Sequence, residues 1–207
     1  MKNQKLHRCN RKEKTLRVEI RNDSVLIDGY VNAVGRDSKP IRGENGERFL
    51  EQIVPGAFKR ALKRAVEVTV MLNHERVVGS TKTNLKLMED SIGLRAICEI
   101  TDAEVIQKAK EKKLRGWSFG FIELKASEED TPSGMKRRFV EELELREVTI
   151  VDDRKIPCYA GTLINTRADG EAERTETRSQ EFEAIYEEEK ASLNYDTYKQ
   201  RIRALEK

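Results

Sequence analysis

Histidine and cysteine are scarce in this chain of 207 residues, which has two of the former and three of the latter. Cys9, Cys98 and Cys158 are odd in number and widely spaced, so they fit neither a disulfide framework nor a metal-binding knuckle. We therefore expect reduced thiols, with Cys98 in the core, and we expect no metal and no cofactor. A reaction that needs an imidazole base must use His7 or His74.

Long apolar runs are absent as well. No stretch approaches the roughly 20 apolar residues that a membrane-spanning helix needs. The N-terminus is basic, but the apolar segment of an export signal does not follow it. These absences predict a soluble protein without a membrane partner.

An excess of one charge sign is also missing, because 40 Lys and Arg face 37 Asp and Glu, for a formal net charge of +3. This balance creates no overall field that favours nucleic acid. Aromatic residues make up only 6% of the chain, and they do not alternate with basic residues in a pattern that could stack on bases. We expect no nucleic-acid partner, and a nucleic-acid-associated module ranks as a lower alternative.

Charged residues of both signs are abundant instead, at 37% of the chain. That richness predicts a solvated segment beside a packed domain. Residues 1–14 are expected to form a basic, flexible N-terminus and residues 15–166 the main domain. Residues 167–207 form a charged tail of net charge −3, which leaves +6 for the rest of the chain. The tail is expected to be helical, over 181–190 and 195–205, or disordered, and a folded second domain is the alternative.

Alternating apolar residues predict strands through most of the main domain. Helical spacing occurs at 49–65, where Pro55 suits a first turn, and at 101–114, where Thr101 or Asp102 can cap the helix. The pattern predicts an α+β fold, mainly antiparallel β, built as a barrel or sandwich with a few packed helices. The predicted strands are two within residues 15–35, and one each at 68–72, 85–88, 93–100, 117–124 and 139–151.

His74 is the stronger candidate for a base, because His7 lies in a polar terminus. It follows directly on the predicted strand 68–72, and a strand end can hold a side chain at the lip of a cleft. Taken alone, a histidine beside Glu75 is more often a plain surface residue.

Ser118 is the candidate nucleophile, since it lies between Gly116 and Gly120 in a predicted strand. Alternation puts Trp117 and Phe119 on the buried face and Ser118 on the other. Glycines weaken a strand unless something approaches the backbone closely, and a substrate acyl group is one such thing; a tight bend is the structural alternative. The triplet also matches the nucleophile elbow of α/β-hydrolases, but there a helix follows the serine and the histidine comes last, so that match is rejected.

A serine hydroxyl needs a base, and the base works best when a carboxylate orients it. Strand 139–151 supplies several carboxylates. Glu147 shares the alternation of Leu143 and Leu145, so it is expected to point inward toward a partner such as His74. Glu144 is the second choice.

Several short motifs occur in an order that resembles the prohead (capsid maturation) serine proteases of tailed bacteriophages, whose fold is similar to that of the herpesvirus assemblins. The resemblance extends over residues 16–164. The motifs are residues 29–30 (GY), 53–58 (IVPGAF), 72–74 (LNH) with Gly79, 93–94 (GL), 118–121 (SFGF) and 147–151 (EVTIV).

The resemblance implies that residues 15–166 are a protease domain and that the protein is a serine endopeptidase with Ser118, His74 and Glu147 as its catalytic residues. Assemblins use a second histidine as the third member, which this chain lacks, so a carboxylate is implied instead. Arg154 is a weak candidate for an oxyanion donor. No metal or cofactor is implied.

Implied partners are the major capsid protein, whose scaffolding region would be cleaved, and the protease itself, through autoproteolysis and self-association. The implied location is the host cytoplasm inside the assembling prohead, or a bacterial cytoplasm if a prophage encodes the chain. Two alternatives remain: a noncatalytic capsid assembly or scaffolding protein of the same fold, and a serine esterase of unrelated purpose.

Overall fold

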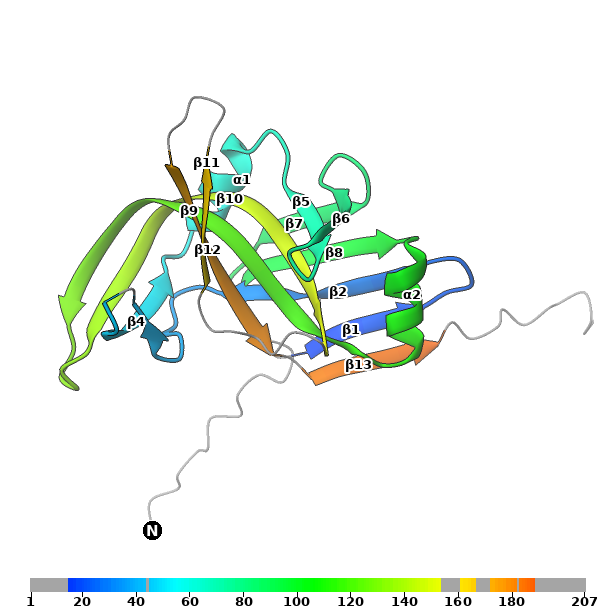
Figure 1. The fold of residues 1–207 in the computed structure, drawn as a ribbon, viewed down its shortest axis with the longest axis horizontal. Helices are drawn as coiled ribbons and strands as arrows, with labels where there is room; N and C mark the ends of the chain where they lie inside the picture. Colours follow the sequence, from blue (N-terminus) through cyan, green and yellow to red (C-terminus); the bar gives the residue numbers. More distant parts are fainter. Residues whose placement is uncertain (1–14, 44, 154–160, 167–171, 182, 189–207) are drawn as a thin grey trace, which may run out of the picture.

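The computed structural model describes residues 15–188, except 44, 154–160, 167–171 and 182 (Figure 1). Within this part of the chain, most residues lie in strands and two short helices accompany them. No helix in it is long and apolar enough to cross a membrane.

The first sheet has five strands in the order β13-β1-β2-β8-β7. All neighbours are antiparallel except β13, which pairs in parallel with β1. The strands are β1 (Thr15–Ile20), β2 (Val25–Ala33), β7 (Leu85–Glu89), β8 (Gly93–Ile100) and β13 (Glu183–Glu188).

The second sheet is built around the long hairpin of β9 and β10, which curves across the molecule in Figure 1. Its main order is β11-β12-β9-β10-β4-β3, and β5 joins it by pairing in parallel with β10 while β6 pairs with β5. The strands are β3 (Ile41–Arg42), β4 (Arg48–Ile53), β5 (Thr69–Leu72), β6 (Arg76–Ser80), β9 (Leu114–Asp130), β10 (Lys136–Asp152), β11 (Gly161–Thr166) and β12 (Ala172–Glu181).

Both helices begin where a carboxylate satisfies their first amides. In α2 (Ala103–Lys110), the Asp102 side chain accepts hydrogen bonds from the amides of Glu104 and Val105. In α1 (Ala57–Arg64), Gly56 has φ 88° and no side chain, and the carboxylate of Glu89 accepts from the Gly56 and Lys59 amides instead. A negative charge at a helix N-terminus also interacts favourably with the helix dipole.

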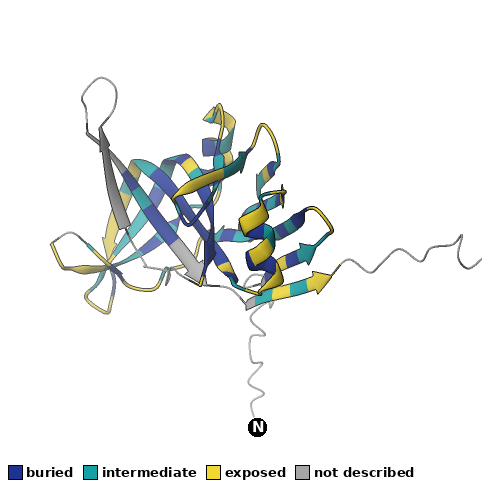
Figure 2. Cartoon of the chain, turned by 45° about the vertical axis from the view of Figure 1, so that its right-hand side comes forward, coloured by how far each residue is buried: buried dark blue, intermediate teal, exposed yellow. Residues whose placement is uncertain are grey.

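The core lies between the two sheets and α1, as the buried positions in Figure 2 show. Trp117, Phe119 and Phe121 of β9 are fully buried, and the ring of Phe58 packs edge-on against that of Phe119 at 5.4 Å between centroids. Cys98 is buried as predicted, and burial raises the pKa of its thiol. The alternation along β9 therefore points its aromatic residues into the core, as expected from the sequence.

The short helix expected within 49–65, with Pro55 near its first turn, runs from Ala57 to Arg64. The residues before it pair with β10 as strand β4, which was not expected. Two other expectations about the elements are wrong. The helix expected at 101–114 ends at Lys110, and Leu114 already begins β9. The helix expected at 181–190 is strand β13 in its described part.

The tail expected from residue 167 onward contributes β12 and β13, which pair with β9 and β1. The helix expected at 195–205 lies outside the described residues. An α+β fold dominated by antiparallel strands is confirmed, but of barrel and sandwich only the sandwich is consistent with these sheets, because neither strand order closes on itself.

Candidate active site

The three candidate residues come from adjacent segments of the second sheet. β9 and β10 pair so that Ser118 lies opposite Thr149 and Gly120 lies opposite Glu147. Cross-strand partners share one face of a sheet, so all four lie on the face turned away from Trp117 and Phe119.

A β-bulge decides where Glu147 points. The register shifts between Leu145, which pairs with Phe121, and Glu147, which pairs with Gly120, so Arg146 is the extra residue. A bulge reverses the phase of the residues beyond it. Leu145 and Val148 are therefore both in the core, and Glu147 lies on the face of Ser118 rather than in the inward phase expected from strict alternation.

His74 is held in the turn between β5 and β6. Asn73 and His74 both have positive φ, at 55° and 61°, a conformation that costs a residue with a Cβ roughly 1–2 kcal/mol. The buried Asn73 fixes this turn to β10. Its main-chain amide donates to the carbonyl of Ile150 at 2.9 Å, and its side-chain oxygen accepts from the main-chain amide of Asp152 at 3.1 Å.

The structure brings His74, Ser118 and Glu147 into one hydrogen-bonded row. His74 Nε2 is 2.8 Å from Ser118 Oγ, and His74 Nδ1 contacts Glu147 Oε1. With a hydrogen on Nδ1, the imidazole donates to the carboxylate and leaves the Nε2 lone pair for the serine hydroxyl. The side chains of His74 and Glu147 are 17% and 14% exposed, so their attraction is weakly screened by water.

Two further residues support the carboxylate. The hydroxyl of Thr149 donates to Glu147 Oε1 at 3.3 Å and lies 3.3 Å from His74 Nδ1. A Cβ added at Gly120 would lie 3.0 Å from Glu147 Cγ and 3.2 Å from its Oε1. The glycine therefore leaves room for Glu147.

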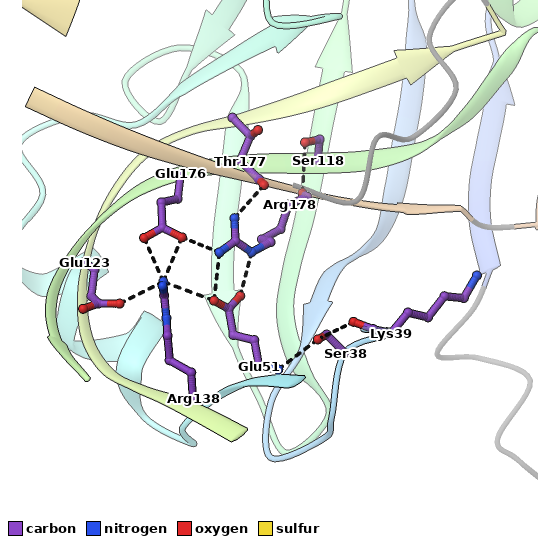
Figure 3. A network of polar contacts seen from close by, with 9 residues as sticks. All are labelled: Ser38, Lys39, Glu51, Ser118, Glu123, Arg138, Glu176, Thr177 and Arg178. Atoms are coloured by element: carbon purple, nitrogen blue, oxygen red, sulfur yellow. Dashed lines mark hydrogen bonds and ion pairs between the residues drawn. The ribbon is translucent and has the colours of Figure 1, made fainter. Parts of the chain in front are cut away.

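A strand of the C-terminal segment covers Ser118. β12 pairs antiparallel with β9, with Arg178 opposite Phe119, and Ser118 is fully buried. The serine hydroxyl donates to the main-chain carbonyl of Arg178 at 2.9 Å (Figure 3).

The side chain of Arg178 enters a cluster of charges on the core side of β9 (Figure 3). Its Nε and Nη2 donate to the two oxygens of Glu51, each at 2.8 Å, and Nη2 also contacts Glu176. Burial disfavours the charged forms of both Glu176 and Arg178. The nearby guanidinium groups of Arg178 and Arg138 nevertheless hold the pKa of Glu176 below its usual value. The carboxylates of Glu51 and Glu176 likewise raise the pKa of Arg178.

The remaining candidates fall elsewhere. Glu144 pairs with Arg146 at 2.7 Å and is not in the row, while His7 and Arg154 lie outside the described residues. Within the described part, no group of three or more His, Cys, Asp or Glu could hold a metal ion. Sequence reasoning missed Asn73 and Thr149, which lie beside His74 and Glu147 within motifs it had noted, and Glu51 and Arg178, which no local pattern distinguishes.

Residues 12–177 match the family model of the caudovirus prohead serine protease. No match was found among curated proteins or solved structures. The match covers most of the 207 residues, and the chain therefore belongs to the prohead serine protease family of tailed phages, the serine proteases of phage capsid maturation.

Proposed function

We propose that the chain is an endopeptidase in which Ser118 is the nucleophile, His74 the general base and Glu147 the residue that orients the base. The observation that carries this proposal is the row itself, with Nε2 of the only described histidine 2.8 Å from the serine hydroxyl and Glu147 behind it. Nucleophile, base and orienting carboxylate in hydrogen-bond reach of one another make a hydroxyl reactive at neutral pH.

The reaction is acyl transfer to serine and then to water. His74 Nε2 takes the hydroxyl hydrogen as Ser118 Oγ attacks the peptide carbonyl carbon, and the imidazolium then gives that hydrogen to the leaving amine. Water hydrolyses the resulting ester in the same way and restores the serine. Glu147 stabilises the imidazolium and keeps the hydrogen of the resting imidazole on Nδ1.

We further propose that the substrates are the scaffolding region of the major capsid protein and the protease itself, inside the immature prohead. Membership of the prohead protease family supports capsid proteins as partners in general. Self-association and self-cleavage within the shell belong to the same proposal.

Coexpression with the major capsid protein of the same phage tests this function. The wild type is compared with Ser118→Ala and with Ser127→Ala, a matched serine on the exposed part of β9 whose hydroxyl donates to Glu141. We expect the wild type and Ser127→Ala to shorten the capsid protein, and Ser118→Ala to leave it whole, as measured by intact mass.

If the wild type leaves the capsid protein whole in properly assembled shells, a noncatalytic assembly protein of the same fold becomes the better description. If Ser118 cleaves small esters faster than any peptide, the chain is better described as an esterase. Labelling with a fluorophosphonate, which reacts with activated serines of any specificity, separates the loss of nucleophile reactivity from the loss of substrate recognition.

A further inference from the structure

β12 lies on β9 in the way that a peptide substrate would. Residues 176–181 pair with residues 116–121 of β9, the stretch that carries Ser118. Without β12, this edge of β9 would have unpaired main-chain groups directly beside the nucleophile. Such an edge binds an extended peptide by adding it as a strand, with main-chain hydrogen bonds for affinity and side-chain pockets for specificity.

The carbonyl of Arg178 is the group presented to Ser118, because the serine hydroxyl donates to it at 2.9 Å. A hydroxyl has one hydrogen, so while it donates to Arg178 it cannot donate to His74 Nε2. The contact places the carbonyl oxygen of Arg178, among the residues of β12, against the hydroxyl of Ser118. The peptide bond that follows this carbonyl joins Arg178 to Ser179.

The pocket for the Arg178 side chain belongs to the body of the protein. Glu51 on β4 binds both Nε and Nη2 of Arg178, and the Phe121 ring lies 5.4 Å from the guanidinium carbon. A fork of this kind recognises a guanidinium much better than a neutral side chain.

Charge balance in this pocket favours a basic side chain. With β12 absent, the body would contribute Glu51, Glu123 and Arg138. Arg138 pairs with Glu51 at 3.2 Å and with Glu123 at 2.8 Å. These are two carboxylates and one guanidinium. β12 adds Arg178 against Glu51 and Glu176 against Arg138, so Arg178 is the second cation of the cluster and the one that pairs most closely with Glu51. Glu51 is only 4% exposed, and a buried carboxylate is stable only when it is paired.

We propose that β12 occupies the substrate groove of this protease, that Glu51 makes the groove select an arginine or lysine, and that the bond after that residue is cut. In this chain the selected bond is Arg178–Ser179, whose cleavage would be the self-processing step. The inference rests on the proposed function and names its substrate class.

The step itself is ordinary peptide hydrolysis. Ser118 Oγ forms a bond to the carbonyl carbon of Arg178, the bond from that carbon to the Ser179 nitrogen breaks, and His74 delivers the hydrogen it took from Ser118 to the departing nitrogen. Water then releases Arg178 as a carboxylate. One water is consumed, and no other reactant is needed.

Intact mass of the purified full chain tests the self-processing site. We expect wild type to split between residues 178 and 179, Arg178→Lys to split at the same bond, and Ser118→Ala to stay whole. Arg178→Glu places a carboxylate against Glu51, so we expect cleavage at this bond to be slower by at least about tenfold. Cleavage of wild type at another bond, an equal rate for Arg178→Glu, or an uncut wild type that still cleaves the capsid protein would overturn the inference and leave β12 as a structural strand.

Peptides added in trans test the role of Glu51. The enzyme is the full-length Arg178→Glu chain, whose own strand Glu51 repels, and the substrates are peptides of residues 172–188 with Arg, Lys or Gln at position 178. We expect kcat/KM for Arg and Lys to exceed that for Gln by at least about tenfold. Adding Glu51→Gln should remove most of this preference, whereas adding Glu128→Gln, at an exposed glutamate paired with Lys136 on the hairpin, should keep it.

Fluorophosphonate labelling separates the two proposals. Release of β12 in Arg178→Glu should increase labelling of Ser118 over wild type, and Arg178→Gln serves in its place if that chain does not fold. If these chains are labelled and cut the capsid protein but all three peptides react equally, the specificity inference fails and the proposed function stands. If no chain is labelled and none cuts any substrate, the proposed function itself fails.

Discussion

Gly120→Ala is expected to lower kcat strongly while changing the free energy of unfolding only slightly. The added Cβ would lie 3.0 Å from Glu147 Cγ, 3.2 Å from Glu147 Oε1 and 3.3 Å from Thr175 Cγ2. Contacts this close are tighter than ordinary van der Waals distances, so Glu147 must move by a few tenths of an ångström. Since Glu147 contacts His74 Nδ1 on one side and Thr149 on the other, the movement disturbs the orientation of the imidazole.

The stability change combines two opposing effects. Overpacking a well-filled site costs about 1–3 kcal/mol, and replacing glycine by alanine within a strand recovers about 0.5–1 kcal/mol. A net loss of roughly 0–2.5 kcal/mol is expected, within the tolerance of a typical domain. Misplacing a catalytic group by a fraction of an ångström to 1 Å lowers kcat by up to about 10²-fold. Denaturant unfolding measures the first quantity, and turnover of a peptide or of the capsid protein measures the second.

A double-mutant cycle provides the control. If Gly120→Ala acts through Glu147, it should lower kcat by less than about twofold when Glu147 is already alanine, because the group it displaces is gone. An activity of Gly120→Ala within twofold of wild type at unchanged stability would refute the placement of Glu147 behind His74. So would a full effect that persists in the Glu147→Ala chain.

Three further predictions concern neighbouring parts of the site. Glu147→Gln keeps the shape but removes the charge and should lower kcat by up to about 10⁴-fold, whereas Glu144→Gln should leave it within twofold; turnover assays of both decide between the two carboxylates. Asn73→Ala removes the acceptor of the Asp152 amide and should cost about 1–3 kcal/mol in denaturant unfolding, and full stability in that assay would contradict the role given to Asn73. Lys108→Met deprives the fully buried Asp152 of its 2.6 Å ion pair and should cost about 3–5 kcal/mol, and a change below about 1 kcal/mol would show that other contacts suffice.

The strands of the main domain could be predicted because their stability comes from apolar residues that alternate in the sequence. β2 and β8 show this alternation in their burial, and β9 shows it in its aromatic residues. His74 could be selected because the chain has only two histidines, and Ser118 because it lies between two glycines and within a motif of the family resemblance. Nothing in this reasoning depended on contacts between distant segments.

β4 and β12 could not be predicted, because their positions depend on distant partners. Residues 172–181 are polar and show no apolar alternation, yet they form a strand along β9 and place Arg178 against Glu51. The pairing energy comes from main-chain groups that every residue has, and from ion pairs between residues far apart in the chain, Arg178 with Glu51 and Glu176 with Arg138. A sequence window that contains only one of the two partners carries no sign of either contact.

Glu147 reaches the candidate site by a route that strict alternation did not predict. Strict alternation predicted an inward side chain that needs a partner, whereas the bulge at Arg146 moves Glu147 to the face of Ser118 and lets Val148 take the core position. Without that bulge, the carboxylate would lie on the core side of the sheet with Leu145 and Phe121, where burying a charge carries a desolvation cost. The bulge therefore lets β10 contribute to the core on one side and to the candidate site on the other, with Arg146 as the residue that absorbs the change of phase.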